Sequence, residues 1–387
     1  MAQSFHVVPL HNQIAHLKRW IVAAMNRAIE SAADIGVQIV FRLIDAVYPH
    51  VRSHTGGDNP RVRHITGWTY MYYIQKLVSP NIEKWLAQRG ALFPHVIQIQ
   101  TINRCNASCN MCPYPYTVHL QPKQIMDDAL FSKIVAECAG HPDLHEFVPM
   151  SKNEPLLDPK LEERIAEFKA AAAPHQLVEV VTNASALTPK RYEKLLQSGL
   201  DLLTISLSAH TEATFNKVMQ GLSWTQIKKN LEALTQASTA TVNVMLRFVP
   251  LRDNDSEFPA FRRYWLGKGF NVMRFAINNR AGVVKNYAEM LPQARHLIFN
   301  LSRRAMGRRY LKVCPHVFSM IHVLENGDVP LCANDWENRE ILGNVQNNTL
   351  AEIYNGPRYQ EIRELMVQRR YEDIPACKDC SFWKDWL

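Results

Sequence analysis

The sequence has no long hydrophobic run and no start typical of a secretion signal. No apolar stretch approaches the roughly 20 residues that a membrane-spanning helix needs. The first six residues lack the cationic start and the following apolar run of a signal peptide. We therefore expect a cytosolic (cytoplasmic) protein that does not span a membrane.

A concentrated basic segment is also missing. The net charge is +8 over 387 residues, but Lys and Arg are spread along the chain and no nucleic-acid-binding motif accompanies them. The excess of positive charge suits an anionic substrate or an acidic protein partner. We expect no nucleic-acid partner. The chain is otherwise ordinary, with 47% hydrophobic residues, and its length suits two domains better than one.

The first 94 residues contain no cysteine, and no glycine precedes Gly36. Apolar residues recur at helical spacing from Ile14 to Leu43, and a second helical stretch is expected over residues 68–89. A basic amphipathic helix can lie on a membrane surface, but packing on the rest of the protein is the interpretation we favour. We predict an N-terminal helical extension over residues 1–94.

The eight cysteines form one group of three, one group of four and an isolated Cys138. In a cytosolic protein, clustered thiols serve metals more often than disulfides. Cys138 lies in an amphipathic pattern and is expected to be a buried apolar residue. Three thiolates on one loop can hold three irons of a 4Fe–4S cluster and leave the fourth iron open, whereas structural zinc prefers four protein ligands. The group of three is Cys105, Cys109 and Cys112.

From residue 95 onward, short β runs alternate with helical segments, which implies parallel strands joined by right-handed crossovers. Six such units predict an α/β fold, a partial (βα)6 barrel like part of a TIM barrel, over residues 95–295. Barrel enzymes carry reactive groups at the C-terminal ends of strands, and the three-cysteine loop follows the first strand. The expected strands are Val96–Ile102, Glu146–Met150, Leu177–Val181, Leu202–Leu207, Val242–Phe248 and Val272–Ile277, with helices at Leu161–Ala172, Pro189–Gln197, Trp224–Thr235 and Ser256–Lys268.

The second group of cysteines is expected in a small C-terminal domain over residues 296–387. The Asn-Gly pair at 326–327 is a strong hairpin signal, and it predicts that Cys314 and Cys332 approach each other. Two distant thiols with a Cys-x-x-Cys pair can hold either zinc or a 4Fe–4S cluster. The group is Cys314, Cys332, Cys377 and Cys380.

The Cys-Asn-x-x-Cys-x-Met-Cys-Pro form at residues 105–113 resembles the radical S-adenosylmethionine superfamily, in the subgroup with a second cluster domain called SPASM or, in its shorter version, twitch. The resemblance covers roughly residues 95–387. A full SPASM domain holds seven cysteines, so four make this chain similar to the twitch version, of the 2-deoxy-scyllo-inosamine dehydrogenase type. The resemblance implies two 4Fe–4S clusters, S-adenosylmethionine, and a flavodoxin- or ferredoxin-type electron donor.

The resemblance also implies cofactor-binding residues at strand ends. Family members carry Gly-Gly-Glu-Pro where this chain has Lys-Asn-Glu-Pro at 152–155, and that segment binds the methionyl amino group. The serines at 206 and 208 could contact the ribose or carboxylate, or bond neighbouring backbone instead. Arg247 interrupts an apolar strand, and a buried guanidinium needs the cofactor carboxylate, an acidic substrate or a structural ion pair. The candidates are Met111, Asn153, Glu154, Asn183, Ser206, Ser208 and Arg247, with Arg274 and Arg280 expected on the substrate side.

Three functions stay open at this point. The first is a radical oxidoreductase that removes a hydrogen atom from a substrate, such as a sugar or aminocyclitol alcohol, and passes the second electron to the fully ligated auxiliary cluster. The second is maturation of a ribosomal peptide by cross-linking, epimerisation or decarboxylation. The third is a zinc-binding or electron-transfer protein without catalysis. The sequence names neither the substrate nor a hydrogen donor.

Overall fold

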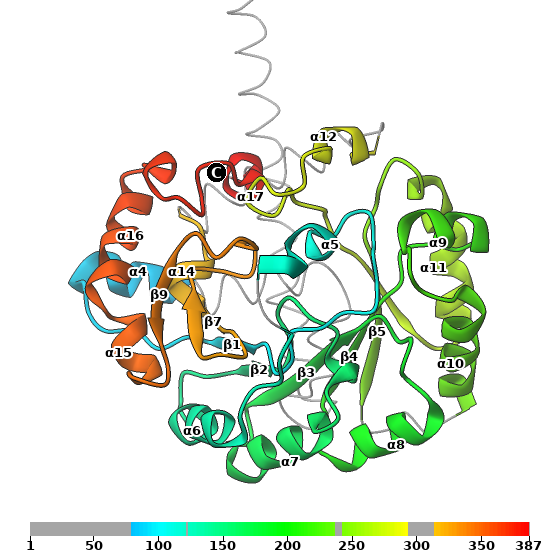
Figure 1. The fold of residues 1–387 in the computed structure, drawn as a ribbon, viewed down its shortest axis with the longest axis horizontal. Coiled ribbons are helices and arrows are strands. Elements are labelled where there is room, and N and C mark those ends of the chain that lie inside the picture. Colours follow the sequence, from blue (N-terminus) through cyan, green and yellow to red (C-terminus); the bar gives the residue numbers. More distant parts are fainter. Residues whose placement is uncertain (1–78, 121–122, 237–241, 293–312, 387) are drawn as a thin grey trace, which may run out of the picture.

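A parallel sheet organises the chain in the computed structural model, which describes residues 79–120, 123–236, 242–292 and 313–386 (Figure 1). Most of the predicted N-terminal extension lies outside these residues. Within them the sheet has seven strands in the order β6-β5-β4-β3-β2-β1-β7, and all neighbours are parallel. The strands are β1 Val96–Ile99, β2 Glu146–Val148, β3 Leu177–Thr182, β4 Leu202–Ser206, β5 Asn243–Phe248, β6 Asn271–Arg274 and β7 Met320–Val323.

The six predicted strands are confirmed, although the first and the last end three residues earlier than expected. Beyond β1 the backbone leaves the ladder, because the Asn103 amide donates to the Gln124 carbonyl at 2.9 Å. The chain therefore turns away before the three-cysteine loop begins.

Strand β7 was not predicted. It pairs with β1 from Val96↔Met320 to Ile99↔Val323, so a segment assigned to the C-terminal domain extends the barrel sheet. The pairing covers the edge that β1 would otherwise expose. The C-terminal domain is thus joined to the barrel by a continuous backbone ladder.

The helices lie outside the strands (Figure 1), and their buried apolar residues share one core cluster with those of the sheet. Phe147 of β2, for example, stacks on Phe168 with ring centroids 4.1 Å apart. Asp127 caps the first of these helices by accepting hydrogen bonds from two of its amides, and Cys138 at the other end is fully buried, as predicted. These helices are α6 Asp128–Cys138, α7 Leu161–Ala171, α8 Pro189–Gln197, α9 Glu212–Val218, α10 Trp224–Gln236 and α11 Phe258–Gly267.

The Asn-Gly pair after β7 forms a tight turn, as predicted, but the strands on its two sides do not pair as a hairpin. Gly327 has φ +88° and donates to the Leu324 carbonyl, while the Leu324 amide donates to Asp328. The returning strand pairs with a later strand rather than extending the main sheet. The remaining elements are β8 Asp328–Pro330, β9 Ile341–Asn344, α5 Tyr114–Thr117, α12 Tyr287–Met290, α14 His316–Ser319, α15 Leu350–Tyr354, α16 Pro357–Val367 and α17 Ser381–Trp386.

The described end of the N-terminal region is helix α4, Ser79–Gln88, and it packs on the C-terminal helices. Trp85 is fully buried and donates to the Gln360 amide oxygen at 2.8 Å. For this helix the preference for packing over membrane binding is confirmed. No helix in the described ranges is long and apolar enough to cross a membrane.

Candidate active site

The three-cysteine loop is held against the segment that follows α9. The Ser108 amide donates to the Gln220 carbonyl at 2.7 Å, and the Asn110 amide donates to Val218 at 3.1 Å. These bonds fix the loop backbone between the cysteines without using any thiol. The loop therefore has a defined shape at the C-terminal end of β1, where the barrel geometry predicted it.

Burial dominates the electrostatics of these thiols. It raises the pKa of Cys105 to about 12 and also raises the pKa of Cys109 and Cys112. The thiols of Cys105 and Cys112 further raise the pKa of Cys109, so the three lie within electrostatic reach of one another. Among the described residues, no three His, Cys, Asp or Glu side chains converge as ligands of one metal ion would. A four-iron cluster binds its thiolates at different irons, so its ligands need not meet at one point.

Glu154 connects the ends of β2 and β3 to the cysteine loop. Its buried carboxylate accepts hydrogen bonds from the Thr182 hydroxyl at 2.5 Å and the Asn183 amide at 2.8 Å. Its own amide donates to the Arg104 carbonyl at 2.8 Å. Burial raises the pKa of Glu154 to about 7, and the bonds from Thr182 and Asn183 oppose that shift.

Asn183 fixes the same loop through its side chain. Its amide nitrogen donates to the Asn106 side-chain oxygen at 2.9 Å, and Asn106 in turn donates to the Ser185 hydroxyl. Asn183 is thus brought to the site, as predicted, but as a support for the cysteine loop.

Several buried polar atoms near this loop have no partner within the protein. They are the amide nitrogen of Asn153, the hydroxyl of Ser151 and the side-chain oxygen of Asn110. Buried polar groups are normally paired, so unpaired ones in one region fit a polar ligand. Met111 is half-buried beside them and packs on the main apolar core.

The fourth and fifth strands bring Ser206 and Arg247 opposite each other in register. The Arg247 guanidinium lies 4.7 Å over the Phe275 ring and 4.0 Å from a Glu179 carboxylate oxygen, while its Nε is buried without a partner. The Ser208 hydroxyl instead accepts from the Val249 amide at 3.1 Å, which is the backbone alternative considered from the sequence.

The two substrate-side arginines differ in their surroundings. Arg274 pairs with Asp255 and stacks on Phe258. Arg280 has φ +49° and donates to the Asn334 side chain at 3.0 Å. The structure therefore brings only the second of them to the site.

The second group of cysteines comes together in the C-terminal domain. Burial raises the pKa of all four thiols, to about 12 for Cys332, and the thiol of Cys380 raises the pKa of Cys332 further. The Cys314 amide donates to the Tyr371 hydroxyl at 3.3 Å. The thiol of Cys332 also raises the pKa of Cys314, so the two cysteines lie within electrostatic reach, in agreement with their predicted approach.

Asn279 begins the Asn-Arg-x-Gly segment at residues 279–282, which resembles a recurring segment of the two-cluster subgroup, but the sequence assigned no role to Asn279 itself. In the structure it joins the Cys377–Cys380 segment to the barrel. Its side-chain nitrogen donates to the Asp379 carbonyl at 2.6 Å, and its oxygen accepts from the Ser381 amide at 2.8 Å. Gly282 lies against the same segment with φ +87°, and a Cβ there would meet the Asp379 Cβ at 2.7 Å. No local pattern could have revealed these contacts, because they join residues about one hundred positions apart.

A small apolar cluster lies against the first cysteine group. It consists of Tyr114, Val283 and Trp336, and Cys105 and Cys112 pack against it. Trp336 follows Cys332 by four residues, and its indole nitrogen is buried without a partner. Sequence reasoning missed Trp336, which carries no motif.

Arg280 lies near both cysteine groups. Burial lowers the pKa of its guanidinium, and the thiols of Cys112, Cys332 and Cys380 oppose that shift. Since Cys112 belongs to the first group and the other two to the second, one guanidinium is within electrostatic reach of both.

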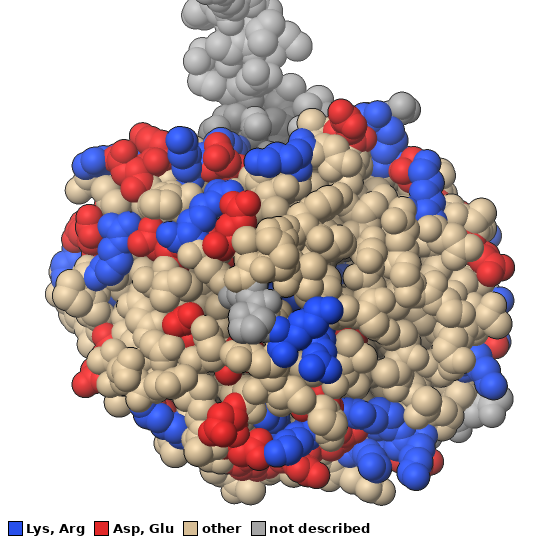
Figure 2. Space-filling model, viewed as in Figure 1, with Lys and Arg blue, Asp and Glu red and all other residues tan. Residues whose placement is uncertain are grey.

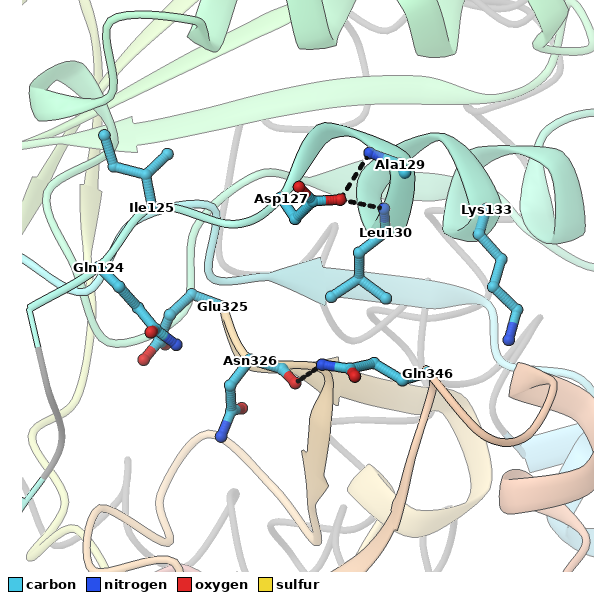
Figure 3. A pocket seen from close by; sticks show the side chains of 9 residues that line it. All are labelled: Gln124, Ile125, Asp127, Ala129, Leu130, Lys133, Glu325, Asn326 and Gln346. Atoms are coloured by element: carbon cyan, nitrogen blue, oxygen red, sulfur yellow. Dashed lines mark hydrogen bonds between the residues drawn. The ribbon is translucent and has the colours of Figure 1, made fainter.

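A separate hollow of about 580 Å³ lies between the start of α6 and the β7–β8 turn (Figure 3). Its lining includes Asp127, Lys133 and Glu325, but no cysteine and no candidate site residue. On the face seen in Figure 2, basic and acidic side chains alternate around the rim and the middle carries few charges. That face shows no extended basic surface.

A parallel partial barrel with a three-cysteine loop at its C-terminal end and a four-cysteine domain beside it defines an iron–sulfur enzyme. The chain belongs to the radical SAM superfamily: the model of that superfamily matches residues 99–264, and that of the SPASM iron-sulfur cluster-binding domain matches residues 314–381. The predicted family and fold class are confirmed, while the predicted domain boundaries stay predictions. Two such domains imply two 4Fe–4S clusters, with S-adenosylmethionine as the partner of the first.

Two curated relatives have low identity over most of the chain. The tungsten-containing aldehyde ferredoxin oxidoreductase cofactor-modifying protein of Pyrococcus furiosus is 23% identical over 74% of this chain and 86% of its own length. The S-adenosyl-L-methionine-dependent 2-deoxy-scyllo-inosamine dehydrogenase of Niallia circulans is 20% identical, with 74% and 92% covered.

Two solved structures share the fold. SuiB of Streptococcus suis, bound to the precursor peptide SuiA, aligns with a TM-score of 0.57 at 12% identity over 73% of this chain and 70% of its own. BtrN in complex with AdoMet and 2-DOIA aligns with a TM-score of 0.50 at 17% identity, with 75% and 94% covered. At such identities the likeness concerns the fold alone.

Proposed function

We propose that the protein is a radical oxidoreductase in which Cys105, Cys109 and Cys112 hold the cluster that cleaves S-adenosylmethionine. Cys314, Cys332, Cys377 and Cys380 hold an auxiliary cluster that accepts an electron. When bound, the first cluster supplies one electron to the sulfonium, which releases methionine and a 5′-deoxyadenosyl radical. That radical takes a hydrogen atom from the substrate, and oxidation is complete once the substrate gives up one further electron and a proton.

The observation that carries this proposal is the closeness of the two cysteine groups. Arg280 is within electrostatic reach of thiols from both, and Trp336 reaches from the second group to pack near Cys105 and Cys112. A substrate held between them would have a source of radical on one side and an electron acceptor on the other. A protein that used the first cluster alone would gain nothing from this arrangement.

The cofactor would be oriented by residues at the strand ends. We assign the Glu154 carboxylate to the methionyl amino group, and the buried, unpaired Asn153 nitrogen supports a donor role for that side chain. We assign Ser206 and Arg247, which are opposite each other in register, to the ribose and carboxylate, and Met111 to the adenine. Asn183 holds the loop, and we assign Ser208 a supporting role because its hydroxyl bonds the Val249 amide.

The substrate side is less constrained. The dehydrogenase relative favours a small molecule with an oxidisable alcohol, such as a sugar or aminocyclitol. Because the SuiB structure holds a precursor peptide, a substrate screen must compare peptides with small-molecule alcohols. Reduction of the first cluster would need a flavodoxin- or ferredoxin-type donor.

Anaerobically purified protein tests the proposal. We expect about eight irons with matching sulfide, and 5′-deoxyadenosine formation with dithionite. Replacing Cys105, Cys109 and Cys112 with Ala should abolish that cleavage and leave about four irons, whereas Cys138→Ala, a buried cysteine outside both groups, should change neither. Zinc without sulfide, or continued cleavage in the triple variant, would refute the assignment.

The auxiliary role has its own test. Replacing Cys377 and Cys380 with Ala should stop substrate turnover while uncoupled cleavage of S-adenosylmethionine continues. Unchanged turnover in that variant would remove the electron-acceptor role and leave the radical chemistry intact.

A further inference from the structure

Lys152 is a buried lysine that links the barrel to the C-terminal domain. It lies just after β2, two residues before Glu154, and its side chain is 5% exposed. Its Nζ donates to the Asp335 carbonyl at 2.5 Å and to the Asn338 side-chain oxygen at 2.6 Å. Burying an ammonium is costly, so such a position calls for an explanation.

The two acceptors of Lys152 are neutral. Among the described residues no carboxylate lies within ion-pair distance of the Lys152 Nζ. The Asp335 carboxylate instead accepts hydrogen bonds from the Arg339 and Glu340 amides, at 3.0 Å each. Glu325 accepts from a glutamine at 2.6 Å. A buried cation without a contacting anion is destabilising unless some other negative group is close.

The turn that contains Cys332 and Asp335 can supply such negative charge. The Asp335 amide donates to the Cys332 carbonyl at 3.1 Å, so Lys152 binds the turn that begins at this cysteine. Burial lowers the pKa of Lys152 to about 8, and the negative charges of Asp335, Cys332 and Glu325 oppose the shift. The ammonium is thus within electrostatic reach of the Cys332 sulfur.

An ammonium also has three N–H donors, and two are occupied here. We propose that Lys152 is a positioning residue of the auxiliary cluster: it holds the Cys332 turn and donates its third N–H to a sulfur of Cys332 or of the cluster. This inference rests on the proposed function, because it takes Cys332 as a cluster ligand. Hydrogen bonds to cluster sulfurs and a nearby positive charge favour the reduced, more negative state and raise the reduction potential.

The consequence is an asymmetry between the two cysteine groups. The Glu154 carboxylate opposes extra negative charge on Cys105 and Cys109, whereas at Cys332 the Lys152 ammonium offsets the nearby Asp335 carboxylate. An electron released by the substrate would therefore favour the auxiliary cluster.

The test uses the Cys105, Cys109 and Cys112 triple-Ala protein, in which the auxiliary cluster is the one left to titrate. Lys152→Met keeps the length of the side chain and removes its charge and donors. At the midpoint potential of the parent protein, EPR should show the ratio of reduced to oxidised cluster fall at least tenfold, which corresponds to 59 mV for a one-electron couple. Lys152→Arg should retain most of the parent ratio.

Lys133 provides a matched control. Its Nζ also donates to two carbonyls of the C-terminal domain, those of Val345 at 2.5 Å and Asn348 at 3.2 Å, but it contacts no cysteine turn. Lys133→Met should leave the ratio unchanged.

The inference is overturned if an iron-loaded Lys152→Met protein has the parent's ratio of reduced to oxidised cluster. It is also overturned if Lys133→Met changes that ratio as much as Lys152→Met does. Loss of auxiliary iron in Lys152→Met supports it if Lys152→Arg restores the iron, and overturns it if both variants lose iron. Failure of the proposed function looks different, because the parent protein would then hold no auxiliary cluster at all.

Discussion

Replacing Asn279 with Ala should loosen the last two cysteines without unfolding the barrel. The variant removes two side-chain hydrogen bonds, to the Asp379 carbonyl and from the Ser381 amide, that flank Cys380. Each such bond contributes about 0.5–1.5 kcal/mol, so the segment should lose roughly 1–3 kcal/mol of local stability. If iron leaves through opening of this segment, that loss corresponds to roughly 5–150-fold faster opening.

The assay is the rate at which a chelator removes iron from anaerobic protein, followed by absorbance and by the EPR signal of each cluster. We expect the auxiliary cluster to be lost faster in Asn279→Ala, with the first cluster unaffected. The reasoning would be refuted by a wild-type rate of iron loss in this variant.

Asn355 offers a control with the same chemistry. Its side chain accepts from the Leu92 amide at 2.8 Å and donates to the Leu92 carbonyl at 2.9 Å, which joins two segments without a cysteine. Asn355→Ala should lower global stability by a similar amount and leave iron release unchanged. Equal acceleration in both variants would mean that iron loss follows general destabilisation.

Three further outcomes follow from the site. Arg280→Gln should shift both cluster potentials to more negative values in an EPR-monitored titration, whereas Arg274→Gln should shift neither. Gly282→Ala should reduce auxiliary iron content, since the new Cβ would meet Asp379 at 2.7 Å and the backbone has φ +87°; full iron content would contradict this. Glu154→Gln should weaken S-adenosylmethionine binding in equilibrium dialysis by roughly 10–150-fold, the effect of losing a charged hydrogen bond of about 1.5–3 kcal/mol.

The sequence predicted the six barrel strands and their helices because each is specified by a local pattern of apolar residues. Pro189–Gln197 and Asp128–Cys138 show this well, since a capping residue precedes each helix. Strand β7 could not be predicted in the same way. Its Met-Ile-His-Val segment is short, and its partner lies more than two hundred residues earlier, so only the folded chain selects the pairing.

The site residues also fall into those that a local sequence pattern reveals and those that only tertiary contacts reveal. The cysteine groups were visible from their spacing, and Glu154 from its place in a strand-end segment. Lys152 and Asn279 lie in recognisable segments, but the sequence assigned neither a role, and Trp336 lies in no motif. Each acts across a contact between the barrel and the C-terminal domain. Such residues are chosen by tertiary packing, which a single sequence does not reveal.

Strand β7 also explains how the two cysteine groups keep their relative position. Cys105 follows β1 by six residues and Cys332 follows β7 by nine, and both strands end at the same edge because Ile99 pairs with Val323. The spacing between the groups is therefore set by a strand register, and not by a linker between domains. A register shift of one residue would turn every β7 side chain to the opposite face and bury the wrong ones, so the ladder resists sliding. The proposed function needs such a fixed spacing, because a substrate held between the two groups must be within reach of both, and the β1–β7 register supplies it.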